Sequence, residues 1–328
     1  MRVAVVGMGK MGLLHSSILN AIPDVEVVAL CDKSFLLRRF LGKVFKGVKV
    51  FKDVNELSKA DVDAVYVTTP IPSHYGVAKA LYSEGIASNV FVEKTLALNF
   101  EQARELRDLA QDYGGVNMVG YVRRFAVTFR EAKRLLDEGV IGEPVSFSAY
   151  AYSSEFYGVS KGSKVTVPEV GVVRDLGCYA IDLALWFFGE LEVLDAEVKA
   201  VVSDRSEDSA RVEVEASGGL RGEFSFSWCV DKHRMPEAGF VVEGSEGALS
   251  VNDDKLELRL KDGSVSRWFR HDLKDTVDFW LGLPEFFRED KHFVDCVVRG
   301  CSAEPSFADG AEVDRIIDEI RSRAGRYG

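Results

Sequence analysis

A glycine-rich segment near the start of the chain has the residue types and spacing of a phosphate-binding loop. Residues 7–12 read Gly-Met-Gly-Lys-Met-Gly and fit the pattern G-x-G-x-x-G. In this pattern the first glycine permits a tight turn, the second lets a pyrophosphate approach the backbone, and the third allows close helix–strand packing. A predicted strand precedes the segment and a predicted helix follows it, so the helix N-terminus would offer N–H groups to phosphates. The residues expected to contact a dinucleotide here are Gly7, Gly9, Lys10, Met11 and Gly12.

Asp32 ends the next predicted strand and should select the cofactor. A carboxylate at this place can accept hydrogen bonds from both hydroxyls of a ribose and repels a 2′-phosphate, so the sequence predicts NAD rather than NADP. Lys33, Arg38 and Arg39 lie nearby and could reverse part of that preference. The two arginines also fit the solvated face of the following helix, and NADP stays an alternative.

A second cluster follows a predicted strand at residues 89–92, where Glu93 and Lys94 stand together. In open α/β sheets, ligands bind outside the carboxyl ends of the strands. A lysine at that position would stand beside a nicotinamide and could hold or polarise a substrate oxygen. The alternative is a structural Glu–Lys pair without chemistry.

A third cluster lies within residues 174–183. Spacings of four and seven residues put Asp175, Tyr179 and Asp182 on one face of a predicted helix whose remainder is apolar. Polar groups at the start of a buried helix need partners, and a pocket would supply them. The alternative is that Asp175 is only an N-cap.

The elements that must position the first two clusters alternate up to about residue 120. Near-continuous Val, Ile and Leu runs separated by helices predict a parallel sheet covered on both faces. The predicted strands are Val3–Val6, Val25–Leu30, Val48–Phe51, Ala64–Val67, Asn89–Val92 and Asn117–Val119. The predicted helices lie near 11–22, 34–43, 73–84 and 100–112.

After about residue 140 the pattern changes. Residues 211–216 and 222–228 alternate apolar and polar side chains about Gly218-Gly219, which predicts a hairpin with one buried face. Further strands are expected near 239–243, 248–251, 256–260 and 265–270, and helices near 286–299 and 309–323. We therefore expect an α/β Rossmann domain with a doubly wound parallel sheet over 1–121. An α+β domain with a large open antiparallel sheet should follow over 122–328.

Composition excludes several classes of protein. The 328 residues carry a net charge of −11, so nucleic acid is not an expected partner. No run approaches the roughly 20 apolar residues of a membrane helix, and no signal peptide precedes the first strand. The five cysteines form no CxxC pair and the five histidines show no metal-binding spacing, so no metal site is predicted and each histidine is taken as surface or structural. We expect a cytoplasmic protein.

Taken in order, these segments resemble the Gfo/Idh/MocA family (glucose–fructose oxidoreductase, inositol dehydrogenase, rhizopine catabolism). The resemblance runs nearly end to end. The matching segments are the glycine-rich loop, 68–74 as T-P-x-x-x-H, 93–95 as E-K-P, 120–125 as G-[FY]-x-R-R-F, 141–144 as I-G-x-[PV], and 174–182 as D-x-G-x-H-x-x-D.

The resemblance implies a pyridine-nucleotide oxidoreductase that acts on a sugar, a cyclitol or a related hydroxyl–carbonyl pair. It implies that Lys94 is the catalytic lysine, Asp175 its supporting carboxylate, and Tyr179 the residue at the position of the usual histidine. It also implies a homodimer or homotetramer built through residues 145–270. Further implied contacts are Thr69, Pro70, His74, Glu93 and Lys94 for the cofactor, and Lys94, Arg123, Asp175, Tyr179 and Asp182 for the substrate, with Arg124 as an alternative to Arg123.

Two departures from the family pattern affect the chemistry. Thr95 replaces the usual proline, and Tyr179 replaces histidine as the proposed acid/base. A secondary alcohol loses hydride only as its hydroxyl proton is taken up, and a nearby ammonium such as that of Lys94 would favour the phenolate. Alternatively Lys94 relays the proton and Tyr179 only binds the substrate.

Two other hypotheses stay open. The chain could be a non-catalytic dinucleotide-binding sensor of the same fold, or it could recycle a tightly held cofactor between two sugars. Lys161 and Lys164 could also meet a phosphate or carboxylate on a substrate, although the alternative of solvated loop lysines is favoured.

Overall fold

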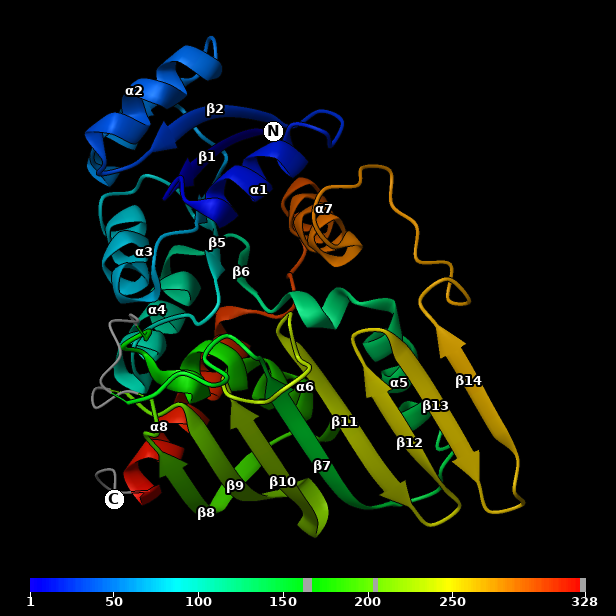
Figure 1. Ribbon diagram of the computed structural model, residues 1–328. Helices are drawn as coiled ribbons and strands as arrows, with labels where there is room; N and C mark the ends of the chain where they lie inside the picture. Colours follow the sequence, from blue (N-terminus) through cyan, green and yellow to red (C-terminus); the bar gives the residue numbers. More distant parts are fainter. Residues whose placement is uncertain (162–166, 203–205, 325–328) are drawn as a thin grey trace. The chain divides into compact units, whose positions relative to one another are not determined.

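The computed structural model describes residues 1–161, 167–202 and 206–324. The chain forms two units, one of Met1–Val122 with Thr276–Asp314 and the other of Arg123–Asp275 with the chain from Arg315 onward (Figure 1). The sequence suggests a division into 1–121 and 122–328, which stays a prediction. That division does not include the return of the chain to the first unit at Thr276–Asp314.

The first unit contains a six-stranded, wholly parallel sheet in the order β3-β2-β1-β4-β5-β6. Its strands are almost continuous apolar runs because both faces are covered. Their bounds are β1 Arg2–Val6, β2 Glu26–Cys31, β3 Lys49–Phe51, β4 Ala64–Val67, β5 Asn89–Glu93 and β6 Asn117–Gly120. The predicted Rossmann-type sheet is confirmed.

Helices of the first unit pack in pairs, α1 against α7 and α3 against α4 (Figure 1). The helix bounds are α1 Lys10–Leu19, α2 Phe35–Val44, α3 His74–Ser83, α4 Phe100–Tyr113 and α7 Pro284–Arg299, with short turns η1 Val54–Lys59 and η2 Ile71–Ser73. The chain moves outward from β1 to β3 and then resumes at β4, so the switch point lies between β1 and β4. Ligands of such sheets bind at the carboxyl ends of the strands beside that point.

The second unit contains an eight-stranded sheet in the order β14-β13-β12-β11-β7-β10-β9-β8. All neighbouring strands are antiparallel except the parallel pair of β7 and β10. The strand bounds are β7 Pro144–Tyr152, β8 Leu191–Lys199, β9 Ser209–Ala216, β10 Leu220–Ser227, β11 Glu237–Gly244, β12 Gly247–Asn252, β13 Lys255–Leu260 and β14 Val265–Phe269. The expected large, mainly antiparallel sheet is confirmed.

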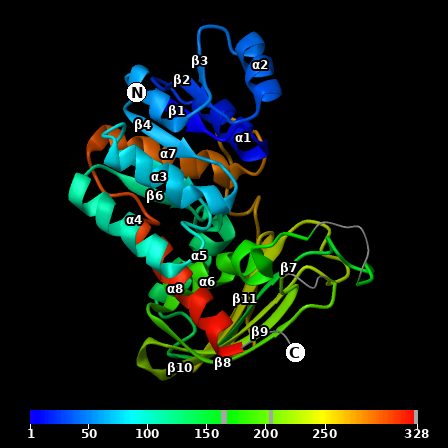
Figure 2. The same ribbon diagram turned by 90° about the vertical axis from the view of Figure 1, so that its left-hand side faces the viewer.

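The predicted hairpin is the pair β9 and β10, joined through the short turn η5 (Ser217–Gly219). Gly218 and Gly219 both have positive φ, which a side chain would disfavour. Val214 and Phe224 belong to the buried face, as the alternation predicts. Helices α5 (Val127–Asp137) and α6 (Cys178–Phe188) pack on the sheet, as Figures 1 and 2 show for α6.

Some elements lie outside the sequence prediction. A register shift between Val193 and Asp195 interrupts the alternation of β8, and α5 starts after Ala126, which has no capping side chain. The helix predicted over the third cluster exists, but it begins as a π-helical turn, η4, at Val173–Gly177. The remaining elements are the short turn η3 (Val122–Phe125) and the last helix α8 (Phe307–Ala324). Among the described helices, none is both long and apolar enough to cross a membrane.

Candidate functional site

The glycine-rich loop between β1 and α1 has the backbone that a dinucleotide requires. Gly7 has φ +95, and a Cβ there would lie 2.6 Å from the Thr69 amide nitrogen. A Cβ on Gly12 would lie 2.0 Å from the Gly7 carbonyl oxygen, so α1 packs too closely on the loop for any side chain. A Cβ on Gly9 would meet nothing within 4 Å, which leaves open space beside the backbone where a pyrophosphate would approach.

The start of α1 leaves its own N–H groups to an anion. Its N-cap is Gly9, which has no side chain to accept them, and Lys10 and Met11 form the first turn. The residues present therefore fit a dinucleotide phosphate on steric and electrostatic grounds.

Asp32 lies at the end of β2, where its carboxylate holds the loop. One oxygen accepts from the Met8 amide at 2.8 Å and the other from the Ser34 amide at 2.7 Å. Each carboxylate oxygen has a second lone pair, so both can still accept a ribose hydroxyl. Arg38 donates to the Asp32 and Lys33 carbonyl oxygens and thus points back toward this strand end rather than only into solvent.

The turn after β4 is tied to the turn after β5 through His74. The buried ring places Nδ1 2.7 Å from the Thr95 carbonyl oxygen and Nε2 2.6 Å from the Thr69 carbonyl oxygen. Burial lowers the pKa of His74, and the two carbonyl contacts oppose that effect only in part. The His74 side chain therefore holds the two turns together. The predicted role in cofactor binding stays a prediction for Thr69, Pro70 and His74.

Lys94 follows β5 and is half-buried. The Lys94–Thr95 peptide is cis even though Thr95 stands where the family pattern has proline. The Thr95 hydroxyl donates to the Ala97 carbonyl oxygen, and the Ala97 amide donates to the buried Asp314 carboxylate. These hydrogen bonds of Thr95 and Ala97 therefore fix the backbone that follows Lys94.

Glu93, which precedes Lys94, fixes the backbone at the Lys94 amide. Its carboxylate accepts from the Lys94 amide at 3.0 Å through Oε2, and its Oε1 lies 2.9 Å from His15 Nε2. Burial alone would raise the pKa of Glu93, but the hydrogen bond and charge of His15 bring that pKa below its usual value. The sequence predicted a cofactor contact for Glu93, which stays a prediction; in this structure its carboxylate faces His15.

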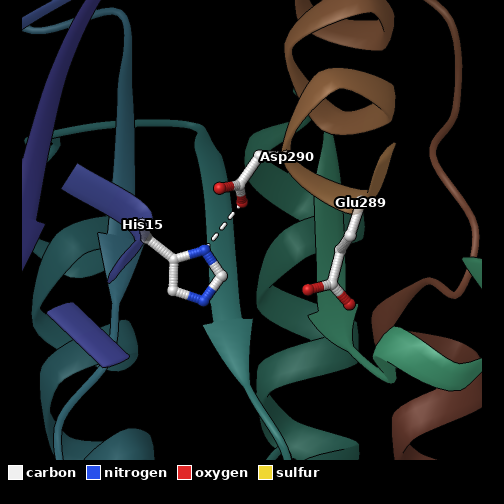
Figure 3. A group of neighbouring side chains, drawn as sticks. All are labelled: His15, Glu289 and Asp290. Carbon is white, nitrogen blue, oxygen red and sulfur yellow. Dashed lines mark hydrogen bonds and ion pairs between the residues drawn. The ribbon is translucent and has the colours of Figure 1, made fainter. Parts of the chain in front are cut away.

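Figure 3 shows His15 with two acidic residues of α7, Glu289 and Asp290. The His15 Nδ1 lies 2.7 Å from an Asp290 oxygen, and potential ligand atoms of the three residues lie within 4.8 Å of one another. All three side chains are buried. The sequence alone predicts His15 as a surface or structural residue and does not reveal this cluster, because Asp290 lies far along the chain and no local spacing links the two.

In the second unit, Arg123 organises the surroundings of Tyr179. Its guanidinium lies 4.1 Å above the Tyr179 ring, a cation–π contact. Arg123 also donates to Asp253 at 3.0 Å and to the Pro236 carbonyl oxygen at 2.9 Å. Asp253 is not among the predicted site residues, because in the sequence it resembles an ordinary turn residue between two strands.

Arg124 and Asp182 form a buried bidentate ion pair. The Arg124 Nε donates to Asp182 Oδ2 at 3.0 Å and Nη2 donates to Oδ1 at 2.7 Å. The two side chains are 6% and 1% exposed. A substrate contact for Asp182 stays a prediction, and in this structure its carboxylate holds Arg124.

Asp175 lies inside the π-helical turn η4 that precedes α6. The N-cap positions are Val172 for the turn and Gly177 for α6, so the alternative that Asp175 is an N-cap is wrong. A Cβ on Gly177 would lie 2.7 Å from the Phe226 ring, so the turn packs directly on β10. Single π-helical turns often occur at functional sites.

The structure thus brings predicted site residues together within each unit. The glycine loop, Asp32 and the Thr69 turn meet at the switch point of the parallel sheet, and Arg123 meets Tyr179 in the second unit. Lys161 is exposed, and Lys164 lies outside the described residues.

Two family models match the chain. One, described as oxidoreductase family, NAD-binding Rossmann fold, matches residues 1–121, and the other, the GFO/IDH/MocA C-terminal domain, matches residues 129–250. The chain is 27% identical to D-apiose dehydrogenase of Paraburkholderia graminis, over 98% of this chain and 88% of that protein. It is 26% identical to inositol 2-dehydrogenase of Rhizobium meliloti, over 98% and 97% respectively. Levoglucosan dehydrogenase in complex with NADH has the same fold, with TM-score 0.87 and 21% identity over 99% of this chain and 96% of that one.

Proposed function

The chain belongs to the Gfo/Idh/MocA family of NAD-binding oxidoreductases, and from this premise we propose that it oxidises a secondary hydroxyl of a sugar, cyclitol or sugar derivative. The observation that carries the proposal is the loop at the switch point, where Gly9 leaves open space beside the N-terminus of α1 and Asp32 stands at the end of β2. The substrate class is supported by the names of the relatives, a D-apiose and an inositol dehydrogenase.

The cofactor contributes one thing to this chemistry: when bound, NAD⁺ accepts a hydride at its nicotinamide ring. We assign Gly7, Gly9 and Gly12 to the phosphates and Asp32 to the adenosine ribose. The carboxylate of Asp32 would repel a 2′-phosphate, which favours NAD over NADP. The guanidinium of Arg38, bonded to the Asp32 carbonyl oxygen, is the group that could moderate this preference.

We assign the substrate proton to Tyr179, with Lys94 and Asp175 in support. A hydroxyl must lose its proton as hydride leaves, and a phenolate next to cations can take that proton. Arg123 supplies one cation over the Tyr179 ring and fixes the orientation of the ring through its own bonds to Asp253. In the direction of reduction the same phenol would donate the proton.

The experiment begins with a screen of polyols, aldoses and sugar phosphates with NAD⁺ and NADP⁺, followed through the absorbance of the reduced nicotinamide. On a substrate that turns over, Tyr179→Phe should lower kcat by roughly 10²-fold, the usual range for a general acid–base group. Tyr179→His should retain more activity, and the pH at which the oxidation rate rises should move down toward neutrality, because histidine has an ordinary pKa of about 6.5.

The exposed Tyr157 offers a matched control, and Tyr157→Phe should leave kcat unchanged. A Tyr179→Phe variant as fast as the wild type would contradict the assignment and leave the proton to Lys94. Tight NAD(H) binding without turnover of any sugar or polyol would instead favour a sensor.

We also propose a homodimer or homotetramer built through residues 145–270. In the single chain, one face of the eight-stranded sheet is exposed and carries side chains such as Ser148, Arg211 and Glu213. The wide sheet offers such a face to a second copy, which would cover it sheet to sheet.

A further inference from the structure

His15 is a fully buried side chain held between two carboxylates. Its Nδ1 lies 2.7 Å from Asp290 Oδ1 and its Nε2 lies 2.9 Å from Glu93 Oε1. An ionised carboxylate only accepts hydrogen bonds, and a neutral imidazole has a single N–H. Burial raises the pKa of Asp290, but while both carboxylates are ionised the two contacts are satisfied together only by an imidazolium that donates from each nitrogen.

The electrostatics agree with this geometry. Although burial alone would lower the pKa of His15, the charges and hydrogen bonds of Asp290 and Glu93 raise it well above the ordinary value. Burial, followed by the charge of Glu93, raises the pKa of Glu289 well above its usual value. The cluster has the residue types of a metal site, but both His15 nitrogens already contact carboxylates, and an imidazolium cannot be a ligand.

The ring of His15 is also fixed by packing. Its centroid lies 5.3 Å from that of Phe91 on β5 and 5.7 Å from that of Tyr66 on β4. With both nitrogens bonded and its faces packed, the imidazolium has no room to change its direction. It therefore presents a fixed N–H to Glu93.

The hydrogen bonds continue from His15 to the residue that we assign to catalysis. Glu93 accepts from His15 through one carboxylate oxygen and from the Lys94 amide through the other. His15 belongs to α1, the helix whose N-terminus follows the glycine loop, and Lys94 follows β5. One chain of hydrogen bonds thus joins the helix of the nucleotide loop to the backbone of Lys94.

We propose that His15 is a positioning residue, which holds the Glu93 carboxylate in the orientation that fixes the Lys94 backbone. The functional consequence rests on the proposed role of Lys94. Without His15, the buried Glu93 carboxylate would lose its hydrogen-bonded cation, and of the two cations that lower its pKa only Lys94 would remain. The carboxylate would turn toward solvent or take up a proton, and in either case the Lys94 amide would lose an oriented, charged acceptor.

The most direct test measures hydrogen exchange of the Lys94 amide by NMR, which requires no substrate. In His15→Phe, which keeps a ring of similar size, this amide should exchange at least about tenfold faster than in the wild type. In Asp290→Asn the neutral His15 can still donate from Nε2 to Glu93, so the exchange rate should stay near that of the wild type.

Phe293→Leu is the matched control, because Phe293 packs on Tyr66 and Phe91 in the same cluster but bonds neither carboxylate. Its Lys94 amide should exchange at the wild-type rate even where its thermal midpoint falls. Equal exchange of that amide in His15→Phe and the wild type would overturn the proposal.

A second measurement does not depend on whether His15→Phe folds. The nitrogen chemical shifts of His15 in the wild type should show both ring nitrogens protonated at about pH 8, well above the ordinary histidine pKa. A His15 Nε2 without a proton at that pH would overturn the proposal, because it could not donate to Glu93.

A kinetic arm separates this inference from the proposed function. With NAD⁺ and myo-inositol as the probe, or another polyol that the wild type oxidises, His15→Phe should lower kcat about tenfold while changing NAD⁺ affinity less than about threefold. Unchanged kcat together with faster amide exchange would contradict the functional consequence. If the wild type oxidises no sugar or polyol, the proposed function fails, and the exchange rate and the nitrogen shifts still decide the role of His15.

Discussion

The buried pair of Arg124 and Asp182 allows the sharpest prediction about the second unit. Both side chains are almost inaccessible, at 6% and 1% exposure, and two hydrogen bonds join them. Removing one partner of such a pair typically costs about 3–5 kcal/mol, because the other charge is left buried and uncompensated. Replacing both partners by apolar side chains of similar volume is often neutral or stabilising.

We therefore expect Asp182→Leu to lower the free energy of unfolding by about 3–5 kcal/mol. At about 2–4 °C for each kcal/mol, the thermal midpoint should fall by roughly 6–20 °C. The double variant Arg124→Met/Asp182→Leu should recover most of this loss. Urea unfolding of wild type, both single variants and the double variant gives the coupling energy directly.

Two results would refute this reasoning. A cost below about 1 kcal/mol for Asp182→Leu would mean that the pair is no stronger than one at the surface. If the double variant loses as much free energy of unfolding as the two single variants together, the contribution of Arg124 to stability does not depend on Asp182. A further variant, Asp182→Asn, tests the predicted substrate contact in a kinetic assay, because its KM should stay within about twofold of the wild type if the Asp182 carboxylate serves Arg124 alone.

Three further predictions concern the cofactor, the assembly and pH. The wild type should bind NAD(H) more tightly than NADP(H), and Asp32→Ser should narrow or invert that ratio in cofactor titrations; a wild type that prefers NADP(H) would contradict the assignment of Asp32. Light scattering should give the mass of a dimer or tetramer at micromolar concentration, and a monomer would refute the sheet-to-sheet assembly. Because the folded pKa of His15 is raised, its stabilising effect is complete below the unfolded value of about 6.5 and is lost as pH rises through the folded value. The stability difference between wild type and His15→Gln should therefore shrink by about 1.4 kcal/mol per pH unit above about pH 6.5, and a difference that grows with pH would rule this out.

The parallel sheet could be predicted because buried parallel strands are continuous apolar runs, as in Ala64–Val67. The hairpin of β9 and β10 could be predicted because one face is exposed to solvent, so polar and apolar residues alternate along both strands. The strand β8 was not predicted, since its register shift at Val193 interrupts that alternation. The helix α5 has no capping side chain to mark its start at Val127.

The site was predictable only where its chemistry is local in sequence. The glycines of the loop and Asp32 stand at fixed spacings, and the structure gives Gly7 and Gly12 the tight turn and close packing expected of them. The partners that hold the site come from far along the chain: Asp290 for His15 and Asp253 for Arg123. No local pattern connects such pairs, because packing alone brings them together.

We propose that the chain is a dehydrogenase in which Lys94 serves the chemical step. This role of Lys94 is tested most directly by the rate of NADH formation at saturating NAD⁺ and substrate in wild type and Lys94→Ala, with NAD⁺ affinity measured in parallel. We expect kcat to be lower by roughly 10²-fold or more in Lys94→Ala. NAD⁺ affinity should change little, because the dinucleotide is assigned mainly to the Gly7–Gly12 loop and Asp32. A Lys94→Ala enzyme with wild-type kcat would contradict a role of Lys94 in the chemical step.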